Sequence, residues 1–152
     1  MPELQELFHE LVRFQIELWN AVDARLRAAH EMPLGWYESM QAISVHPSCR
    51  VNDIADELVI TVGGISKIVD RLETAGLCKR RPNPDDRRSS IIGLTPSGSR
   101  QLAKAATTVE DELQSRLGTA VSARSLQQFG STLGKLRAAG RQTTKREGGT
   151  DD

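Results

Sequence analysis

Near the middle of the chain, the spacing of the apolar residues changes. Up to Leu72 these residues recur every three or four positions, which is typical of one face of an amphipathic helix. The segments 77–82 and 89–94 instead predict two short strands, because a turn containing Asn-Pro-Asp-Asp separates them. Helical spacing resumes at residue 96. The chain therefore predicts a mainly α (α+β) fold with one β-hairpin between helices.

Several helices are expected around this hairpin. Their ranges are 4–29, 34–45, 51–58, 62–75, 96–117 and 123–139, with a short extended segment between the second and the third. The expected order is therefore α-α-(short β)-α-α-β-β-α-α. Side chains that can cap a helix N-terminus stand at Asn52, Thr61, Thr95 and Ser122. Gly76 is expected to end the fourth helix, because glycine adopts the left-handed conformation without strain.

The charges are unevenly distributed along the chain. The whole sequence is neutral, with 20 basic and 20 acidic residues. Residues 66–104 nevertheless hold nine Lys or Arg against four Asp or Glu, and the rest of the chain is correspondingly acidic. A locally basic surface attracts a polyanion even on a neutral protein, so the zero net charge does not exclude a nucleic-acid partner.

The order of elements is that of a winged helix-turn-helix: a short helix, a tight turn, a longer helix and a hairpin. In such a unit the second helix enters the major groove of DNA, and its opposite face packs inward. Ile65, Val69 and Leu72 provide the apolar inward face. Small polar and cationic residues of the outward face and of the hairpin are the expected DNA contacts, namely Thr61, Gly63, Gly64, Ser66, Lys67, Arg71, Arg81, Arg87 and Arg88.

Two of these assignments have alternatives. Gly63 and Gly64 either let the helix backbone approach DNA closely, or the helix simply begins later, near Ile65. The arginines of the hairpin either enter a narrow minor groove, for which arginine is well suited, or form a solvated charged loop.

Three motifs together resemble the MarR family of bacterial transcriptional regulators. They are Gly-Gly-Ile-Ser-Lys-Ile-Val-Asp-Arg-Leu-Glu-Thr-Ala-Gly-Leu at 63–77, Arg-Arg-Pro-Asn-Pro-Asp-Asp-Arg-Arg at 80–88 and Leu-Thr-Pro-Ser-Gly at 94–98. The resemblance implies that Ser66 and Lys67 face the major groove. It also implies that Asp86 orients Arg88 toward the minor groove.

The resemblance further implies a homodimer on a pseudo-palindromic double-stranded operator, joined by long N- and C-terminal dimerisation helices. One domain is expected over 1–140, with the DNA-binding lobe at 34–100, dimerisation helices at 1–30 and 101–139, and a disordered tail at 141–152. The apolar stripes of the terminal helices favour a dimer, because one small lobe cannot easily cover them. An ordinary helical bundle within one chain is the alternative.

Members of the family commonly release DNA when a small aromatic or phenolic effector binds. Trp19, Trp36 and Tyr37 are candidates to line such a pocket, although aromatic residues on helices are more often core residues. Cys49 and Cys78 show no CxxC spacing and are expected to be free thiols, with Cys78 acting as a small apolar residue in its strand.

Other function classes are disfavoured. The chain contains no Gly-rich phosphate loop, no GxSxG and no HExxH, so we expect no enzyme, no catalytic residue, no cofactor and no metal. It also contains neither an apolar run of about 18 residues nor a secretory signal, so a cytoplasmic protein without a membrane partner is expected. A winged helix used only for protein contacts remains the alternative to a ligand-responsive repressor.

Overall fold

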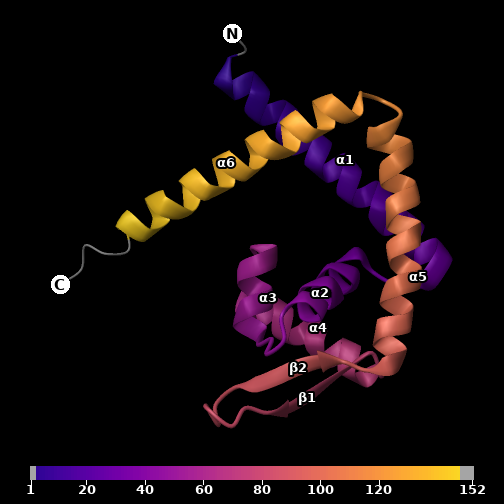
Figure 1. The fold of residues 1–152 in the computed structure, drawn as a ribbon, viewed down its shortest axis with the longest axis vertical. Coiled ribbons are helices and arrows are strands. Elements are labelled where there is room, and N and C mark those ends of the chain that lie inside the picture. The colour runs from indigo at the N-terminus through magenta and orange to yellow at the C-terminus, as the bar shows by residue number, and fades with distance from the viewer. Residues whose placement is uncertain (1–2, 148–152) are drawn as a thin grey trace. The chain divides into compact units, whose positions relative to one another are not determined.

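The computed structural model describes residues 3–147, which form two compact units divided between Glu112 and Leu113. The first unit contains helices α1 to α4, the hairpin and nearly all of α5 (Figure 1). The second unit contains the last residue of α5, the π-helical turn η1 and α6. The bounds are α1 Leu4–His30, α2 Leu34–Val45, α3 Val51–Leu58, α4 Val62–Thr74, β1 Cys78–Pro82, β2 Ser90–Leu94, α5 Pro96–Leu113, the π-helical turn η1 Gln114–Gly118, and α6 Ala123–Glu147.

Local capping explains where three of the helices begin. The hydroxyl of Thr61 accepts the Gly64 N–H at 3.2 Å, and that of Thr95 accepts the Gly98 N–H at 3.0 Å. The hydroxyl of Ser122 likewise accepts the Ser125 N–H at 3.2 Å. These side chains satisfy backbone donors that have no partner inside the helix, as predicted.

The cap predicted for α3 was wrong. The helix begins at Val51, so Asn52 lies inside its first turn and Arg50 occupies the N-cap position. The capping group is Asp53, whose carboxylate accepts the Arg50 N–H at 2.8 Å. An acid at this third position serves the same purpose from inside the helix, where the helix dipole also favours it.

The hairpin is a two-stranded antiparallel sheet in which Cys78 pairs with Leu94 and Pro82 with Ser90. The predicted short extended segment before α3 is a single bridge, in which the Ile92 N–H donates to the Cys49 carbonyl at 2.7 Å. This bridge ties the start of α3 to the sheet. The start of α3 therefore lies against the same sheet that carries the hairpin tip.

The core of the first unit lies between the C-terminal part of α1, the helices α2, α3 and α4, and the sheet. Its fully enclosed side chains include Leu26, Met40, Ile54, Ile65, Val69, Leu72 and Ile92. Gly76 ends α4 with a φ of 74°, as predicted. Gly98 is needed for close packing, because a Cβ there would overlap the Leu77 carbonyl group.

The C-terminal helix α6 extends further than predicted. We predicted disorder from residue 141, but α6 continues to Glu147. The segment 141–147 has no apolar anchor, yet it also has no glycine or proline, and Gln, Arg, Lys and Glu favour helix. The rest of the predicted tail, 148–152, lies outside the described residues. No helix within 3–147 is both long and apolar enough to cross a lipid bilayer.

Candidate nucleic-acid interface

Helix α4 separates an apolar face from a polar one. Ile65, Val69 and Leu72 are fully buried, so the predicted inward stripe is correct. Thr61, Gly63, Lys67 and Arg71 are exposed, and Gly64 and Ser66 are half-buried. The outward face therefore offers small and cationic groups to a partner over the length of the helix.

The two glycines lie inside the first turn of α4, because the helix begins at Val62. The alternative that the helix begins near Ile65 was therefore wrong. A Cβ on Gly63 would meet nothing within 4 Å, whereas one on Gly64 would lie 3.1 Å from the Thr61 hydroxyl. The chain's own packing therefore explains a small residue at position 64 but not at position 63.

The tip of the hairpin is organised by short side chain to backbone hydrogen bonds. The Asp86 carboxylate accepts the backbone N–H of Arg88 at 2.9 Å, and the Asn83 amide oxygen accepts that of Asp85 at 3.0 Å. The Asn83 amide group also donates to the Ser89 hydroxyl at 3.1 Å. Asp86 thus orders the backbone of Arg88 and leaves its guanidinium exposed.

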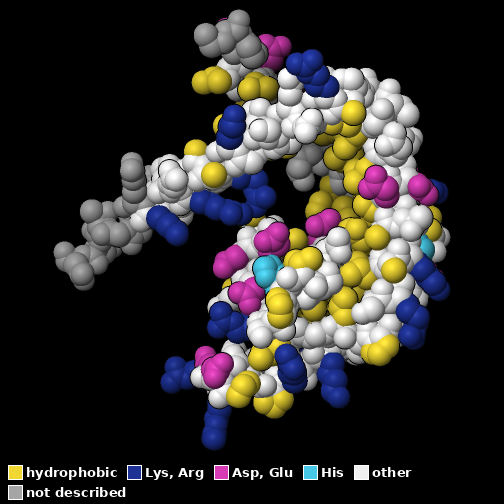
Figure 2. Space-filling view, in the orientation of Figure 1, with side chains coloured by type: hydrophobic (Ala, Val, Ile, Leu, Met, Phe, Trp, Pro, Cys, Tyr) yellow, Lys and Arg dark blue, Asp and Glu magenta, His cyan; other side chains and the backbone are white. Residues whose placement is uncertain are grey.

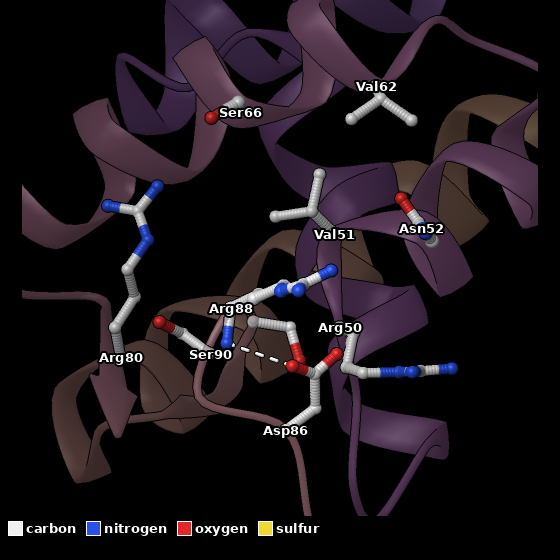
Figure 3. A pocket seen from close by; sticks show the side chains of 10 residues that line it. Arg50, Val51, Asn52, Val62, Ser66, Arg80, Asp86, Arg88 and Ser90 are labelled. Atoms are coloured by element: carbon white, nitrogen blue, oxygen red, sulfur yellow. Dashed lines mark hydrogen bonds between the residues drawn. The ribbon is translucent and has the colours of Figure 1, made fainter. Parts of the chain in front are cut away.

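A hollow of about 440 Å³ lies between the N-termini of α3 and α4 and the hairpin (Figure 3). Arg80 and Arg88 extend toward it from the hairpin side, and Ser66 faces it from α4. The complete lining is Arg50, Val51, Asn52, Val62, Ser66, Arg80, Asp86, Arg88, Ser89 and Ser90. Three guanidinium groups and three hydroxyls around one hollow suit a phosphate chain.

Arg80 differs from the other cations of the hairpin because it is held by acids of α4. Its guanidinium lies 2.6 Å from the Asp70 carboxylate and 3.8 Å from that of Glu73. Its backbone N–H also donates to Glu73 at 2.8 Å. Arg80 therefore ties β1 to α4 and fixes how the hairpin lies against that helix.

Two other predicted cations of the hairpin lie together. Arg81 and Arg87 line a second hollow of about 470 Å³ with Arg80 and Asn83, and both side chains are exposed. Lys and Arg side chains project from the hairpin end of the face shown in Figure 2. The predicted hairpin residues are therefore divided between two hollows, with Asp86 and Arg88 in one and Arg81 and Arg87 in the other.

The predicted effector residues are not brought together. Trp36 lines a shallow hollow of about 370 Å³ with Asp70, Arg71, Thr74 and Ala75, which contains neither of the other two aromatic residues. Tyr37 is only 7% exposed and belongs to the core, whereas Trp19 is 39% exposed on α1. Arg71, a predicted DNA contact, lines this shallow hollow and not the one lined by Ser66 and Arg88.

Both cysteines are free and buried. Burial, with a smaller contribution from nearby Asp53, raises the pKa of Cys49 to about 11. Burial and Glu73 raise the pKa of Cys78 to about 11, against the opposing effect of Arg80. Such thiols are almost wholly protonated at neutral pH, and Cys78 is a small apolar residue in its strand, as predicted.

Sequence reasoning missed several residues of the first hollow. Arg50 and Asn52 stand at the start of α3, which we treated only as a helix boundary. Val62 continues the apolar spacing of α4 and was therefore not considered for the surface. The signal for all three was available, since each lies in the first turn, or at the cap, of a helix in the helix-turn-helix.

Helix α3, the turn at Val59 and Ile60, helix α4 and the paired strands together make a winged helix-turn-helix. The sequence model of the MarR family matches residues 37–90, which span that unit as far as the start of β2.

Two relatives in sequence carry names of the same class of protein. The chain is 27% identical over 143 residues to a Thauera aromatica protein named as a transcriptional regulatory protein for the hcr operon, covering 92% of this chain and 82% of that protein. It is 30% identical over 97 residues to the transcriptional regulator HosA of Escherichia coli O111:H-, covering 60% of this chain and 72% of HosA. Both relatives are named as regulators and neither as an enzyme.

A solved structure shows the same fold. Sco3205, a MarR family transcriptional regulator from Streptomyces coelicolor in complex with DNA, superposes with a TM-score of 0.82. The two chains are 22% identical, and the match covers 92% of this chain and 89% of Sco3205. The protein described here belongs to the MarR family.

Proposed function

We propose that this protein is a cytoplasmic transcriptional regulator that binds a specific double-stranded DNA sequence as a homodimer. In the simplest form it is a repressor that blocks transcription sterically and is released by a small molecule. The observation that carries the proposal is the hollow between α3, α4 and the hairpin, which is lined by Arg50, Arg80 and Arg88 together with Ser66.

The contacts divide into two kinds. Arginines around the hollow supply affinity for phosphate, which does not depend on sequence and weakens with salt. Ser66 and Lys67 stand on the outward face of α4, where side chains reach base edges in the major groove. Arg88, whose backbone is ordered by Asp86, is exposed at the hairpin tip and is proposed to enter the minor groove.

A homodimer is proposed because the N-terminal half of α1 has an uncovered apolar surface. Leu7 is 52% exposed, Phe8 61% and Leu11 41%. Helix α6 has exposed apolar residues of its own, with Phe129 at 44% and Leu136 at 61%. A second copy of the chain covers such stripes symmetrically, and a two-fold dimer matches a pseudo-palindromic operator.

An effector is proposed as an aromatic or phenolic molecule that contacts Trp19, Trp36 or Tyr37. Since these residues lie in different surroundings, each needs its own test. A thermal-shift series with phenolic acids and purines, repeated on Trp19→Leu, Trp36→Leu and Tyr37→Phe, assigns the residue whose replacement removes the stabilisation. No stabilisation by any of these compounds would count against this class of effector.

The function is tested by fluorescence anisotropy on the duplex upstream of the protein's own gene, against a scrambled duplex and over a salt titration. We expect tight binding to the upstream duplex alone, with a steep loss of affinity as salt rises. Equal binding to both duplexes, or none, would contradict the proposal and favour a winged helix used for protein contacts.

Single substitutions assign the residues. Arg88→Ala should weaken binding to every duplex and reduce the salt dependence of the affinity. Lys67→Ala should weaken binding to the upstream duplex more than binding to the scrambled one. Lys104→Ala on α5 is the matched control, since it removes the same charge from an exposed position outside the hollow. Light scattering should show unchanged dimers for all three variants.

A further inference from the structure

Val62 is the first residue of α4, and it is exposed although it continues the inward apolar stripe of that helix. Its side chain is 51% exposed, whereas Ile65, Val69 and Leu72 on the same stripe are at 0%. The stripe therefore runs one turn beyond the core. At that point it faces the hollow between α3, α4 and the hairpin, which Val51 of α3 also lines (Figure 3).

Apart from Val51, the other residues that line this hollow are polar or charged. Arg50 and Arg88 line the same hollow, and Ser66 lies one turn later on the same side of α4. A single exposed valine is ordinary on a protein surface. An exposed valine in a hollow that arginines also line, at the end of α4 proposed to enter the major groove, is placed to contact a base edge.

The chemistry of base edges then selects the group that Val62 contacts. The C5-methyl group of thymine is the apolar group that a base pair presents in the major groove, and aliphatic side chains recognise it by contact. Valine suits this role because its branched Cβ leaves one strongly preferred rotamer in a helix. Gly63 beside it carries no side chain that would hold the helix end away from the bases.

We propose that Val62 is a specificity-determining residue that reads a thymine methyl group in each half of the operator. This inference rests on the proposed function and adds a base preference to it. Ser66 and Lys67 read hydrogen-bonding groups, and Val62 adds selection for thymine over cytosine, which has no methyl group.

The test is a methyl-deletion scan. Duplexes that bind the full-length protein are first selected from a random 25-base-pair library. Each thymine of the selected consensus is then replaced by deoxyuridine, which removes one methyl group and keeps the base pairing. We expect the wild-type protein to lose about fourfold in affinity at one symmetry-related pair of positions for each methyl group removed.

Variants connect that position to the side chain. Val62→Ala, which removes the two outer methyl groups of the side chain, should lose most of the preference for the thymine duplex over the deoxyuridine duplex at that position, and Val62→Ile should keep it. Val45→Ala is the matched control, because Val45 is a 66% exposed valine at the end of α2 and lies outside the hollow. Its deoxyuridine profile should equal that of the wild type, and all three variants should melt at nearly the wild-type temperature.

The outcomes separate this inference from the proposed function. If the wild type selects a consensus but Val62→Ala loses the same affinity as the wild type at every deoxyuridine, the role of Val62 is wrong and the regulator remains. A consensus in which no thymine can be replaced by deoxyuridine with a loss of affinity would likewise show that the role of Val62 is wrong. If the wild type selects no consensus, the proposed function itself is wrong and the assignment of Val62 is wrong with it.

Discussion

Helices α1 and α4 have similar apolar spacing but opposite surroundings. On α4, Ile65, Val69 and Leu72 are completely covered by the rest of the first unit. On α1 only Val22 and Leu26 are buried. The large apolar residues of the preceding half, from Leu4 to Trp19, are exposed by between 37% and 79%, apart from the half-buried Leu18.

The difference shows that apolar periodicity predicts a helix face without predicting what covers it. On α4 the cover is local, because α2, α3 and the sheet lie within one compact lobe. The N-terminal half of α1 extends beyond that lobe, so its stripe is available to another molecule. Both helices serve DNA binding in the proposed function, one by contact and the other by joining two lobes.

The strongest test of this comparison is to make the α1 stripe unfit for burial. Leu7→Glu/Leu11→Glu places two charges on one side of the helix, and we expect a folded monomer by light scattering. Operator affinity should fall by at least about 100-fold, because the two half-sites are no longer bound by one linked molecule.

Gln5→Glu/Gln15→Glu is the matched control, because it adds the same two charges to α1 at exposed polar positions. It should remain a dimer with nearly the wild-type affinity. A Leu7→Glu/Leu11→Glu protein that is still dimeric would show that the exposed stripe of α1 is not the dimer surface.

The corresponding change on α4 acts on folding instead. Leu72→Ala removes a fully buried side chain, so it should lower the free energy of unfolding by about 2–5 kcal/mol in urea titrations. Lys67→Ala, an exposed residue of the same helix, should change it by less than about 0.5 kcal/mol. A small effect of Leu72→Ala would mean that the α4 stripe is less firmly packed than its burial indicates.

Gly63 allows stability and binding to be separated on α4. Gly63→Ala has space for its Cβ and should stabilise the free protein by about 0.5–1 kcal/mol, since alanine favours helix. It should also weaken operator binding by about tenfold, or roughly 1.4 kcal/mol, if the bare backbone approaches DNA. Gly140→Ala on α6, also with free space around the Cβ, should stabilise without weakening binding. Unchanged affinity of Gly63→Ala would remove Gly63 from the interface.

The smallest expected effect lies where α1 joins the lobe. Burial acts to raise the pKa of Asp23, but the backbone N–H of Leu34, at 2.9 Å, and the Arg27 guanidinium outweigh it and hold this pKa below its usual value. Asp23 thereby caps α2, and Asp23→Ala should cost about 1 kcal/mol of stability at pH 7.

The pH dependence follows from the direction of that shift. A carboxyl group with a lowered pKa in the folded state stabilises the protein above its unfolded pKa, and this contribution is lost as the pH falls through the folded value. The difference between wild type and Asp23→Ala should therefore shrink below roughly pH 4. A difference that stays constant over urea titrations from pH 7 to pH 3 would contradict the role of the carboxylate.

Local rules predicted much of the fold from the sequence. The caps at Thr61, Thr95 and Ser122 involve residues three positions apart, so they were visible in the chain. The cap at Asn52 was wrong because Cys49 pairs with Ile92, and α3 begins as soon as that pairing ends. This pairing joins residues more than forty positions apart and has no local signal.

The site was predicted less completely for the same reason. Arg80 looked like another free cation of the hairpin, and its ion pairs with Asp70 and Glu73 depend on where β1 lies against α4. Val62 fits the inward spacing of α4, but the core ends before it. Which predicted contacts share a hollow is likewise a property of the tertiary structure.

The junction around Thr95 has a mechanical consequence. The Thr95 hydroxyl donates to the Gly76 carbonyl at 2.6 Å and its N–H donates to that of Leu77 at 3.1 Å, while Gly98 packs directly on Leu77. The base of α5 is thus clamped to the end of α4 and the start of β1. Because of these contacts, α4 and the hairpin would move together with the base of α5 as one rigid body. In the proposed dimer, a change in the tilt of α5 would therefore alter the spacing between the two DNA-binding lobes and leave the internal structure of each lobe unchanged.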